Sequence, residues 1–166
     1  TEPRIYDKFR LMAQDEQFQY YVDYMNDEAN KSLSRNNAYK KAEQLLNTYK
    51  EDYLNNPELS ANRDRYQQYV DAFTACDYNA IRSDAMKENI KILSGYVGEL
   101  ATLAEKMDSS NLEALNNSIA KIDAFVKENS ELINRGDTSE GGYQDQMAIV
   151  ANVKKGIVKI DNAKVF

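Results

Sequence analysis

The side chains of this chain that could do chemistry are carboxylates, lysines and tyrosines. Its 166 residues include no histidine, no tryptophan and a single cysteine, Cys76. Histidine is the usual general base near neutral pH and a frequent metal ligand. Its absence excludes Ser-His-Asp and Cys-His nucleophile pairs, the Glu-x-x-His motif of di-iron bundles and the common catalytic zinc sites. The sequence also lacks GxxxxGK[ST] and GxGxxG motifs. We therefore expect a protein that is not an enzyme and that uses no cofactor.

Tyrosine is the most unusual component, because ten of the twelve tyrosines lie before residue 79. A tyrosine buries a large apolar ring while its hydroxyl reaches water or a partner, so the residue is enriched at interfaces. One interpretation is an aromatic face or groove for a protein or a small ligand on the first three helices. The other is packing at the boundary of a helical core. The candidate binding residues recur at helical spacing: Tyr20, Tyr24, Tyr49, Tyr53, Tyr66 and Tyr69.

A glycine-rich segment partly resembles two known motifs. Residues 137–148 match several positions of a calcium-binding loop, but Ala148 stands where a bidentate glutamate is needed. We therefore expect no metal there. The same segment contains Arg135-Gly136-Asp137, a tripeptide that can engage integrin-type receptors when a loop displays it. An exposed glycine-rich turn is the simpler interpretation.

Other polar and small residues have structural interpretations. The acidic pairs Asp15-Glu16 and Asp27-Glu28 indicate a solvated face. An enzyme would need convergent carboxylates in one cleft, for instance Asp23 and Asp71, and we do not expect that arrangement. Ser94, Gly98 and Ala101 form a strip of small residues, for which we expect close approach of a neighbouring helix. Cys76 fits a small core residue.

Composition limits the classes of partner. With 42% hydrophobic residues a packed core is expected, and the net charge of −6 disfavours nucleic acid, which attracts clustered Lys and Arg. No apolar run is long enough for a transmembrane segment. The chain begins at Thr1, which fits removal of a secretion signal and trimming of the chain equally well. The compartment stays open, with an extracytoplasmic location slightly favoured over a cytoplasmic one.

Apolar residues at spacings of three and four predict helices throughout. The first is expected over residues 4–33, followed by a break at 34–37. A second ends at Asn55-Asn56-Pro57, where proline stops it. A third carries Tyr66, Tyr69, Val70 and Phe73. Residues 17–25 resemble residues 65–73 at an offset of 48, which indicates either a duplicated hairpin or chance similarity between two amphipathic helices.

The clearest pattern is a heptad stripe over the fourth helix, expected at residues 79–107. Its members are Met86, Ile90, Leu93, Val97, Leu100, Ala104 and Met107. A turn at 108–111 follows, with Ser110 and Glu113 spaced as a capping box. The fifth helix continues the pattern with Leu112, Leu115, Ile119, Ile122, Val126 and Ile133. A sixth helix is expected from Tyr143, with Met147, Val150, Ala151, Ile157 and Val158 on its buried side.

These patterns predict one all-α domain over residues 1–166, a bundle of five or six helices around a long antiparallel helix 4–helix 5 hairpin. Hairpin units at 4–56, 60–107 and 111–162 would compose it. The expected function is a non-enzymatic protein-interaction module that uses the tyrosine-rich face, with a protein partner of unknown identity. The alternatives are a small-ligand binder with a tyrosine-lined pocket, and a structural or oligomerising coiled coil in which chains share the heptad stripe.

Overall fold

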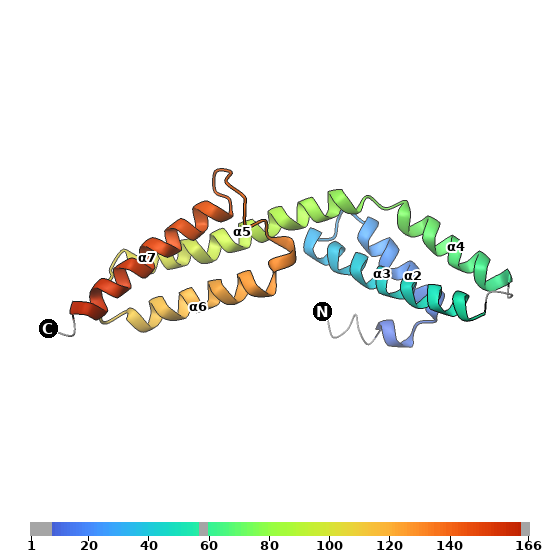
Figure 1. Cartoon of the computed structure of the whole chain (residues 1–166), viewed down its shortest axis with the longest axis horizontal. Coiled ribbons are helices and arrows are strands. Elements are labelled where there is room, and N and C mark those ends of the chain that lie inside the picture. The colour runs from blue at the N-terminus through green and yellow to red at the C-terminus, as the bar shows by residue number, and fades with distance from the viewer. Residues whose placement is uncertain (1–7, 57–59, 164–166) are drawn as a thin grey trace. The chain divides into compact units, whose positions relative to one another are not determined.

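The computed structural model describes residues 8–56 and 60–163, and these residues form helices and no strand (Figure 1). The all-α class is therefore confirmed. The chain divides into two compact units, Thr1–Ala85 (unit 1) and Met86–Phe166 (unit 2). The boundary falls inside one helix, α5 (Tyr78–Ala104), and so inside the hairpin unit predicted at 60–107. Within the described part of the chain, no helix is both long and apolar enough to cross a bilayer.

Unit 1 is built around α2 (Gln14–Asn26), α3 (Ser32–Asn55) and α4 (Ser60–Thr74), with residues 8–11 also helical. Two side-chain bonds show that α2 and α3 are antiparallel. The Tyr49 hydroxyl donates to the Gln14 carbonyl oxygen at 2.7 Å, and Arg35 Nε donates to the Met25 carbonyl oxygen, also at 2.7 Å. The end of α3 thus lies beside the start of α2, and the start of α3 beside the end of α2.

The predicted first helix over 4–33 was wrong in its extent, and residues 4–7 lie outside the described part of the chain. The helix ends at Asn26, because polar side chains there bond to the local backbone. Asp27 accepts the Ala29 N–H at 3.0 Å, and the Asn30 amide donates to the Tyr24 carbonyl at 3.0 Å. The break predicted at 34–37 is instead helical, and Asn36 is buried in α3. The predicted end of this helix at Asn55 is confirmed, while Pro57 lies outside the described residues.

The core of unit 1 combines aromatic residues with small ones such as alanine. Its buried residues are Phe18, Tyr21, Val22, Met25, Ala38, Ala42, Tyr49, Tyr69 and Ile81. Aromatic rings from different helices contact one another. The ring centroid of Tyr69 lies 4.7 Å from that of Phe18 and 4.3 Å from that of Tyr49. Such pairs contribute about 0.5–1.5 kcal/mol each beyond the burial of their area.

Unit 2 contains the rest of α5, α6 (Leu112–Glu128), the short 3-10 helix η1 (Ser130–Leu132) and α7 (Tyr143–Ala163). The ribbon of α6 runs opposite to those of α5 and α7 (Figure 1). Its core is aliphatic: Leu93, Val97, Leu100, Leu112, Leu115, Ile119, Ile122, Val126, Ile133, Val150, Val153 and Ile157. All six apolar residues predicted for the fifth helix are buried, but α6 ends at Glu128 and Ile133 lies after η1. Of the predicted heptad stripe on α5, the central three residues are buried.

One fully buried residue of unit 2 is polar and was not anticipated. Asn89 occupies the turn before Leu93 and donates through Nδ2 to the Leu132 carbonyl oxygen at 3.3 Å. Its Oδ1 has no hydrogen-bond partner among the described residues. The heptad stripe predicted Ile90 at this level, and Ile90 is only partly buried. In the first half of α5, Ala85 and Asn89 are buried, each one residue before the predicted Met86 and Ile90.

The predicted capping box at the start of α6 was wrong. The Ser110 hydroxyl donates to the Asp108 carboxylate, and no side chain of the described residues caps the N-terminus of α6. The Asn111 amide instead closes the end of α5 by donating to the Leu103 carbonyl at 3.0 Å. The predicted turn at 108–111 is nevertheless present, because Asp108 and Asn111 bond to backbone groups across it.

Two further details of unit 2 differ from expectation. Ala151 and Val158 of α7 are exposed, and the buried row runs instead through Gln146, Val150, Val153 and Ile157. The small-residue strip on α5 packs against no helix in the part of the chain that the structure describes. Ser94, Gly98 and Ala101 are exposed, and a Cβ added at Gly98 would meet no atom of the described structure within 4 Å.

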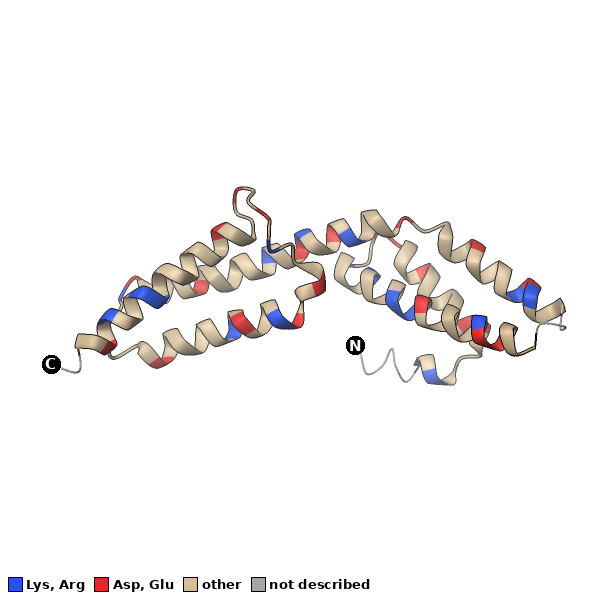
Figure 2. Ribbon diagram, in the orientation of Figure 1, with Lys and Arg blue, Asp and Glu red and all other residues tan. Residues whose placement is uncertain are grey.

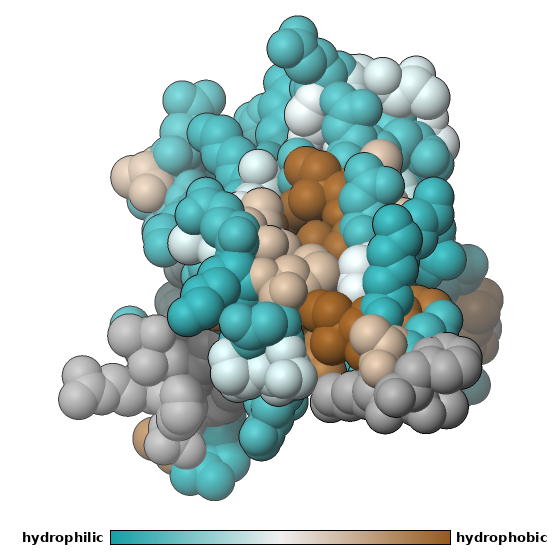
Figure 3. All heavy atoms as spheres, turned by 90° about the vertical axis from the view of Figure 1, so that its left-hand side faces the viewer, coloured by the Kyte–Doolittle hydropathy of each residue, from teal (hydrophilic) through white to brown (hydrophobic). Residues whose placement is uncertain are grey.

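The outer surface mixes polar and apolar groups. Lys, Arg, Asp and Glu are interspersed along the helices of each unit (Figure 2). Figure 3 views the molecule from the end where α7 finishes, and hydrophobic side chains are visible there between hydrophilic ones. Near the ends of α5 and α7, Leu103, Met107 and Ile160 are only partly buried against the core.

Candidate functional site

Helices α2 and α4 are parallel neighbours in unit 1. At their starts, Arg65 Nε of α4 lies 3.8 Å from Asp15 Oδ1 of α2. At their ends, the Asn26 amide donates to Cys76 Sγ at 3.2 Å, across 50 residues of sequence. Because α3 connects α2 to α4 and runs in the opposite direction, the start of α2 lies beside the start of α4, and the two ends also lie side by side. This arrangement forms the walls of a groove.

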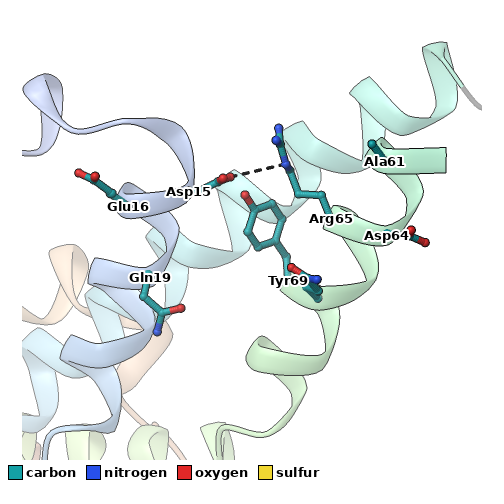
Figure 4. A pocket seen from close by; sticks show the side chains of 8 residues that line it. Asp15, Glu16, Gln19, Ala61, Asp64, Arg65 and Tyr69 are labelled. Carbon is teal, nitrogen blue, oxygen red and sulfur yellow. Dashed lines mark ion pairs between the residues drawn. The ribbon is translucent and has the colours of Figure 1, made fainter. Parts of the chain in front are cut away.

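The α2–α4 groove has a volume of about 680 Å³. Its lining residues are Asp15, Glu16 and Gln19 from α2, and Ala61, Asp64, Arg65, Gln68 and Tyr69 from α4. Seven of the eight are exposed, and the eighth, Tyr69, is buried. The groove is thus open and polar at its walls, with an aromatic ring at its base (Figure 4).

Tyr69 is the least satisfied member of the groove. Only 8% of this residue is exposed, and its ring packs against Phe18 and Tyr49. Its hydroxyl is buried and has no hydrogen-bond partner among the described residues. In Figure 4 the hydroxyl points toward the Asp15–Arg65 ion pair rather than into the core. A buried polar group without a partner costs about 1–3 kcal/mol, so its retention requires a reason.

Most of the charged residues that line the groove are acidic. Asp15, Glu16 and Asp64 contribute three carboxylates, against the one guanidinium of Arg65. The Asp15 and Arg65 side chains are 60% and 54% exposed, so their ion pair contributes at most about 1 kcal/mol. This weak pair leaves the carboxylates and the guanidinium accessible to another charged group.

Neighbouring Tyr49 shows what a satisfied hydroxyl does in the same core. Burial, together with the Asp15 and Asp52 carboxylates and against the opposing effect of Arg65, raises the pKa of Tyr49 to about 12. The hydroxyl therefore stays protonated at neutral pH and donates to the Gln14 carbonyl at 2.7 Å. Tyr49 thereby fixes the end of α3 to the start of α2, which positions Asp15.

The six predicted binding tyrosines differ in burial. Tyr49 and Tyr69 are buried, whereas Tyr20, Tyr24, Tyr53 and Tyr66 are half-buried. The ring centroids of Tyr20 and Tyr24, both on α2, lie 6.3 Å apart. The ring of Tyr53 on α3 is stacked with that of Tyr66 on α4, with 6.0 Å between their centroids. Most of these rings thus pack at the boundary of the core. Tyr69 is the one of the six that lines the groove.

The other polar candidates are occupied by local hydrogen bonds. Asp23 accepts from Gln19 at 2.7 Å and Asp71 accepts from Gln67 at 2.8 Å, one helical turn away in each case. In the described ranges, no group of three or more Cys, Asp or Glu residues could hold a metal ion. Burial raises the pKa of the Cys76 thiol, with the Asn26 hydrogen bond opposing it, so the thiol stays protonated.

The glycine-rich segment is held by its own acidic residues. The Asp137 carboxylate accepts the Ser139 N–H at 3.0 Å and the Ser139 hydroxyl at 2.6 Å. These bonds lower the pKa of Asp137. Asp145 accepts the Gly141 N–H at 2.9 Å, next to the positive φ of 73° at Gly141. Both carboxylates that matched the calcium motif therefore stabilise the turn itself.

Sequence reasoning treated Asp15 and Glu16 as a solvated face and did not single out Gln19, Arg65 or Gln68. All five of these residues are exposed, and the parallel arrangement of α2 and α4 brings them into one groove. The signal that could have located them is the similarity between residues 17–25 and 65–73, whose helices now lie side by side. Comparisons with protein-family models, with curated proteins and with solved structures found no match to this chain.

Proposed function

We propose that the chain is a non-enzymatic protein-interaction module and that its partner binds in the α2–α4 groove. The observation that carries the proposal is the buried Tyr69 hydroxyl, which lacks a hydrogen-bond partner in the described structure and lies at the base of an open groove. A partner that supplies a hydrogen bond there would remove the cost of the buried hydroxyl. A hydrogen bond from the partner to this hydroxyl would therefore contribute to the free energy of binding.

The shape of the groove favours a segment of a protein over a small molecule. Small-molecule sites are generally concave and mostly apolar, and they bury most of the ligand surface. Here seven exposed side chains, most of them polar, border an open groove. A side chain of a larger partner can enter such a groove while the rest of the partner contacts the rims. A small-ligand binder remains the alternative, because a small polar ligand could also satisfy the hydroxyl.

The coiled-coil alternative has less support. Leu93, Val97 and Leu100 are buried against α6 and α7 residues of the same unit. A stripe shared between chains needs these side chains at the surface. Self-association through other surfaces, an extracytoplasmic location, and the count of five or six helices in one bundle with a central hairpin all remain proposals.

Site-directed photo-crosslinking tests the location of the partner. A benzophenone amino acid replaces Gln68 in the groove, and a matched variant carries it at Gln44, which is exposed on α3. We expect the protein with the probe at Gln68 to form a discrete crosslinked species in an extract of its source cells, and the Gln44 variant to form none. An excess of unlabelled wild type should abolish the species. Equal labelling from both positions, or none from either, would contradict the proposal.

A further inference from the structure

We infer that the group entering the α2–α4 groove is a basic side chain of the partner, with arginine fitting best. This inference rests on the proposed function and specifies the chemistry of the same site. The guanidinium would donate to the Tyr69 hydroxyl oxygen and to the Asp15 carboxylate, while Glu16 and Asp64 add negative charge at the rims of the groove. Three kinds of observation support it: the unpartnered hydroxyl, the balance of charge and the exposure of the acidic groups.

The hydroxyl oxygen of Tyr69 is suited to accept a hydrogen bond. A phenol can donate one bond and accept others. In Figure 4 it lies beneath Asp15 and Arg65, so a donor arriving between the helices reaches it once Arg65 moves away from Asp15. Because the ring is fixed by Phe18 and Tyr49, the oxygen is held in place before binding. This pre-organisation lowers the entropy cost of the contact.

The balance of charge favours a cation. Three carboxylates and one guanidinium line the groove, which leaves a net formal charge of −2 at neutral pH. The neighbouring turn adds Asp23 on α2 and Asp71 on α4, both exposed. A carboxylate or phosphate could pair with Arg65, but it would meet this surplus of negative charge. A cation meets repulsion from Arg65 alone among the groove-lining residues.

Arginine fits better than lysine because of its shape. Its planar guanidinium carries five N–H donors and is less strongly hydrated than an ammonium group. It can therefore contact the Asp15 carboxylate and the hydroxyl at the base together. The Arg65–Asp15 pair, at 3.8 Å, is loose enough for an incoming guanidinium to displace Arg65 from Asp15.

Titration with small peptide probes, followed by amide chemical shifts in NMR spectra of the full chain, tests the inference. The probes are three blocked Gly-Ser heptapeptides with a central arginine, citrulline or glutamate. We expect the arginine peptide to shift amides of residues 15–19 and 61–69, and the citrulline peptide, which is neutral and nearly isosteric, to bind about tenfold more weakly. Absence of these shifts with the arginine peptide at about 10 mM would overturn the inference.

Two single substitutions give a sharper test. Tyr69→Phe removes the acceptor and keeps the ring, so binding of the arginine peptide should weaken about tenfold without loss of the fold. Tyr96→Phe is the matched control, because it removes a tyrosine hydroxyl in unit 2, none of whose residues lines the groove. It should leave the affinity unchanged. Equal affinity of wild type and Tyr69→Phe would overturn the role of the hydroxyl.

Arg65→Gln separates a cationic from an anionic occupant, because the two predict opposite changes. Removal of the competing guanidinium should strengthen arginine-peptide binding by about threefold. If the groove instead binds carboxylates, the glutamate peptide should shift the same amides and Arg65→Gln should abolish this effect. That result would overturn the inference and leave the interaction module intact. Failure of crosslinking from Gln68 would instead count against the interaction module.

Discussion

The two units bury their helices with different side chains. Unit 2 has a core of Leu, Ile and Val, whereas unit 1 relies on aromatic rings, several with hydroxyls, around Ala38 and Ala42. Aliphatic side chains are satisfied once they leave water. A buried tyrosine also needs a partner for its oxygen. The comparison indicates why a groove with an unmet hydrogen bond occurs in unit 1.

The largest effects should come from truncating one core residue in each unit. Phe18→Ala in unit 1 and Leu115→Ala in unit 2 each remove a side chain that is at most 1% exposed. Each should lower the free energy of unfolding by about 3–5 kcal/mol. Hydrogen exchange should then rise mainly over residues 14–76 for Phe18→Ala and over residues 112–157 for Leu115→Ala. A uniform rise over the whole chain in both variants would contradict two separate cores.

Removal of single hydroxyls should change stability less and in different directions. Tyr49→Phe leaves the Gln14 carbonyl without its donor and should cost about 1 kcal/mol. Tyr69→Phe removes a hydroxyl that lacks a partner in the described structure, so it should be neutral or slightly stabilising. Chemical denaturation of the two variants measures the difference. If both are destabilised equally, the Tyr69 hydroxyl has a partner in solution.

Alkaline pH should also affect unit 1 first. Burial raises the pKa of Tyr49 to about 12, above the ordinary value of 10.0. A raised pKa in the folded state means that this contribution to stability is complete below pH 10 and is lost as pH rises toward 12. Stability measured between pH 9 and 11.5 should fall less steeply for Tyr49→Phe than for wild type. Parallel curves for the two proteins would show that Tyr49 titrates normally.

The smallest effect should be a gain in unit 2. A Cβ added at Gly98 meets no atom of the described residues within 4 Å, and Gly98 lies inside α5. Gly98→Ala should therefore raise the free energy of unfolding by about 0.5–1 kcal/mol, since alanine has the higher helix propensity. Gly141→Ala is the contrasting control, because the positive φ there strains any L side chain and should destabilise the turn. A loss of stability in Gly98→Ala would show that the strip is packed in solution.

Much of the fold could be predicted from the sequence, and most readily in unit 2. Spacing of apolar residues identified α6, because its stripe faces a single core and is interrupted by few polar residues. The burial of Asn89 could not be predicted, since an Asn–carbonyl bond to Leu132 depends on residues 43 positions apart. The end of α2 was missed because the apolar stripe continues past Asn26 as Ala29 and Leu33, while local bonds of Asp27 and Asn30 stop the helix.

The groove was harder to predict than the helices. Tyr69 was identified as a candidate, but its position three residues from Tyr66 did not show that one ring is buried and the other half-exposed. Asp15 and Arg65 are separated by 50 positions and meet only because α2 and α4 run in parallel. Sequence periodicity assigns a residue to a helix face. It does not specify which two faces adjoin.

The separation of the two cores along the chain also affects how the protein is made. Every buried residue of the aromatic cluster lies at or before Ile81, and every one of the aliphatic cluster lies at or after Leu93. Domains generally fold as units during synthesis, with the N-terminal one first. The groove-bearing half can therefore fold as soon as it leaves the ribosome, while the second half is still being translated. A nascent chain would then present a complete α2–α4 groove before its own synthesis is complete.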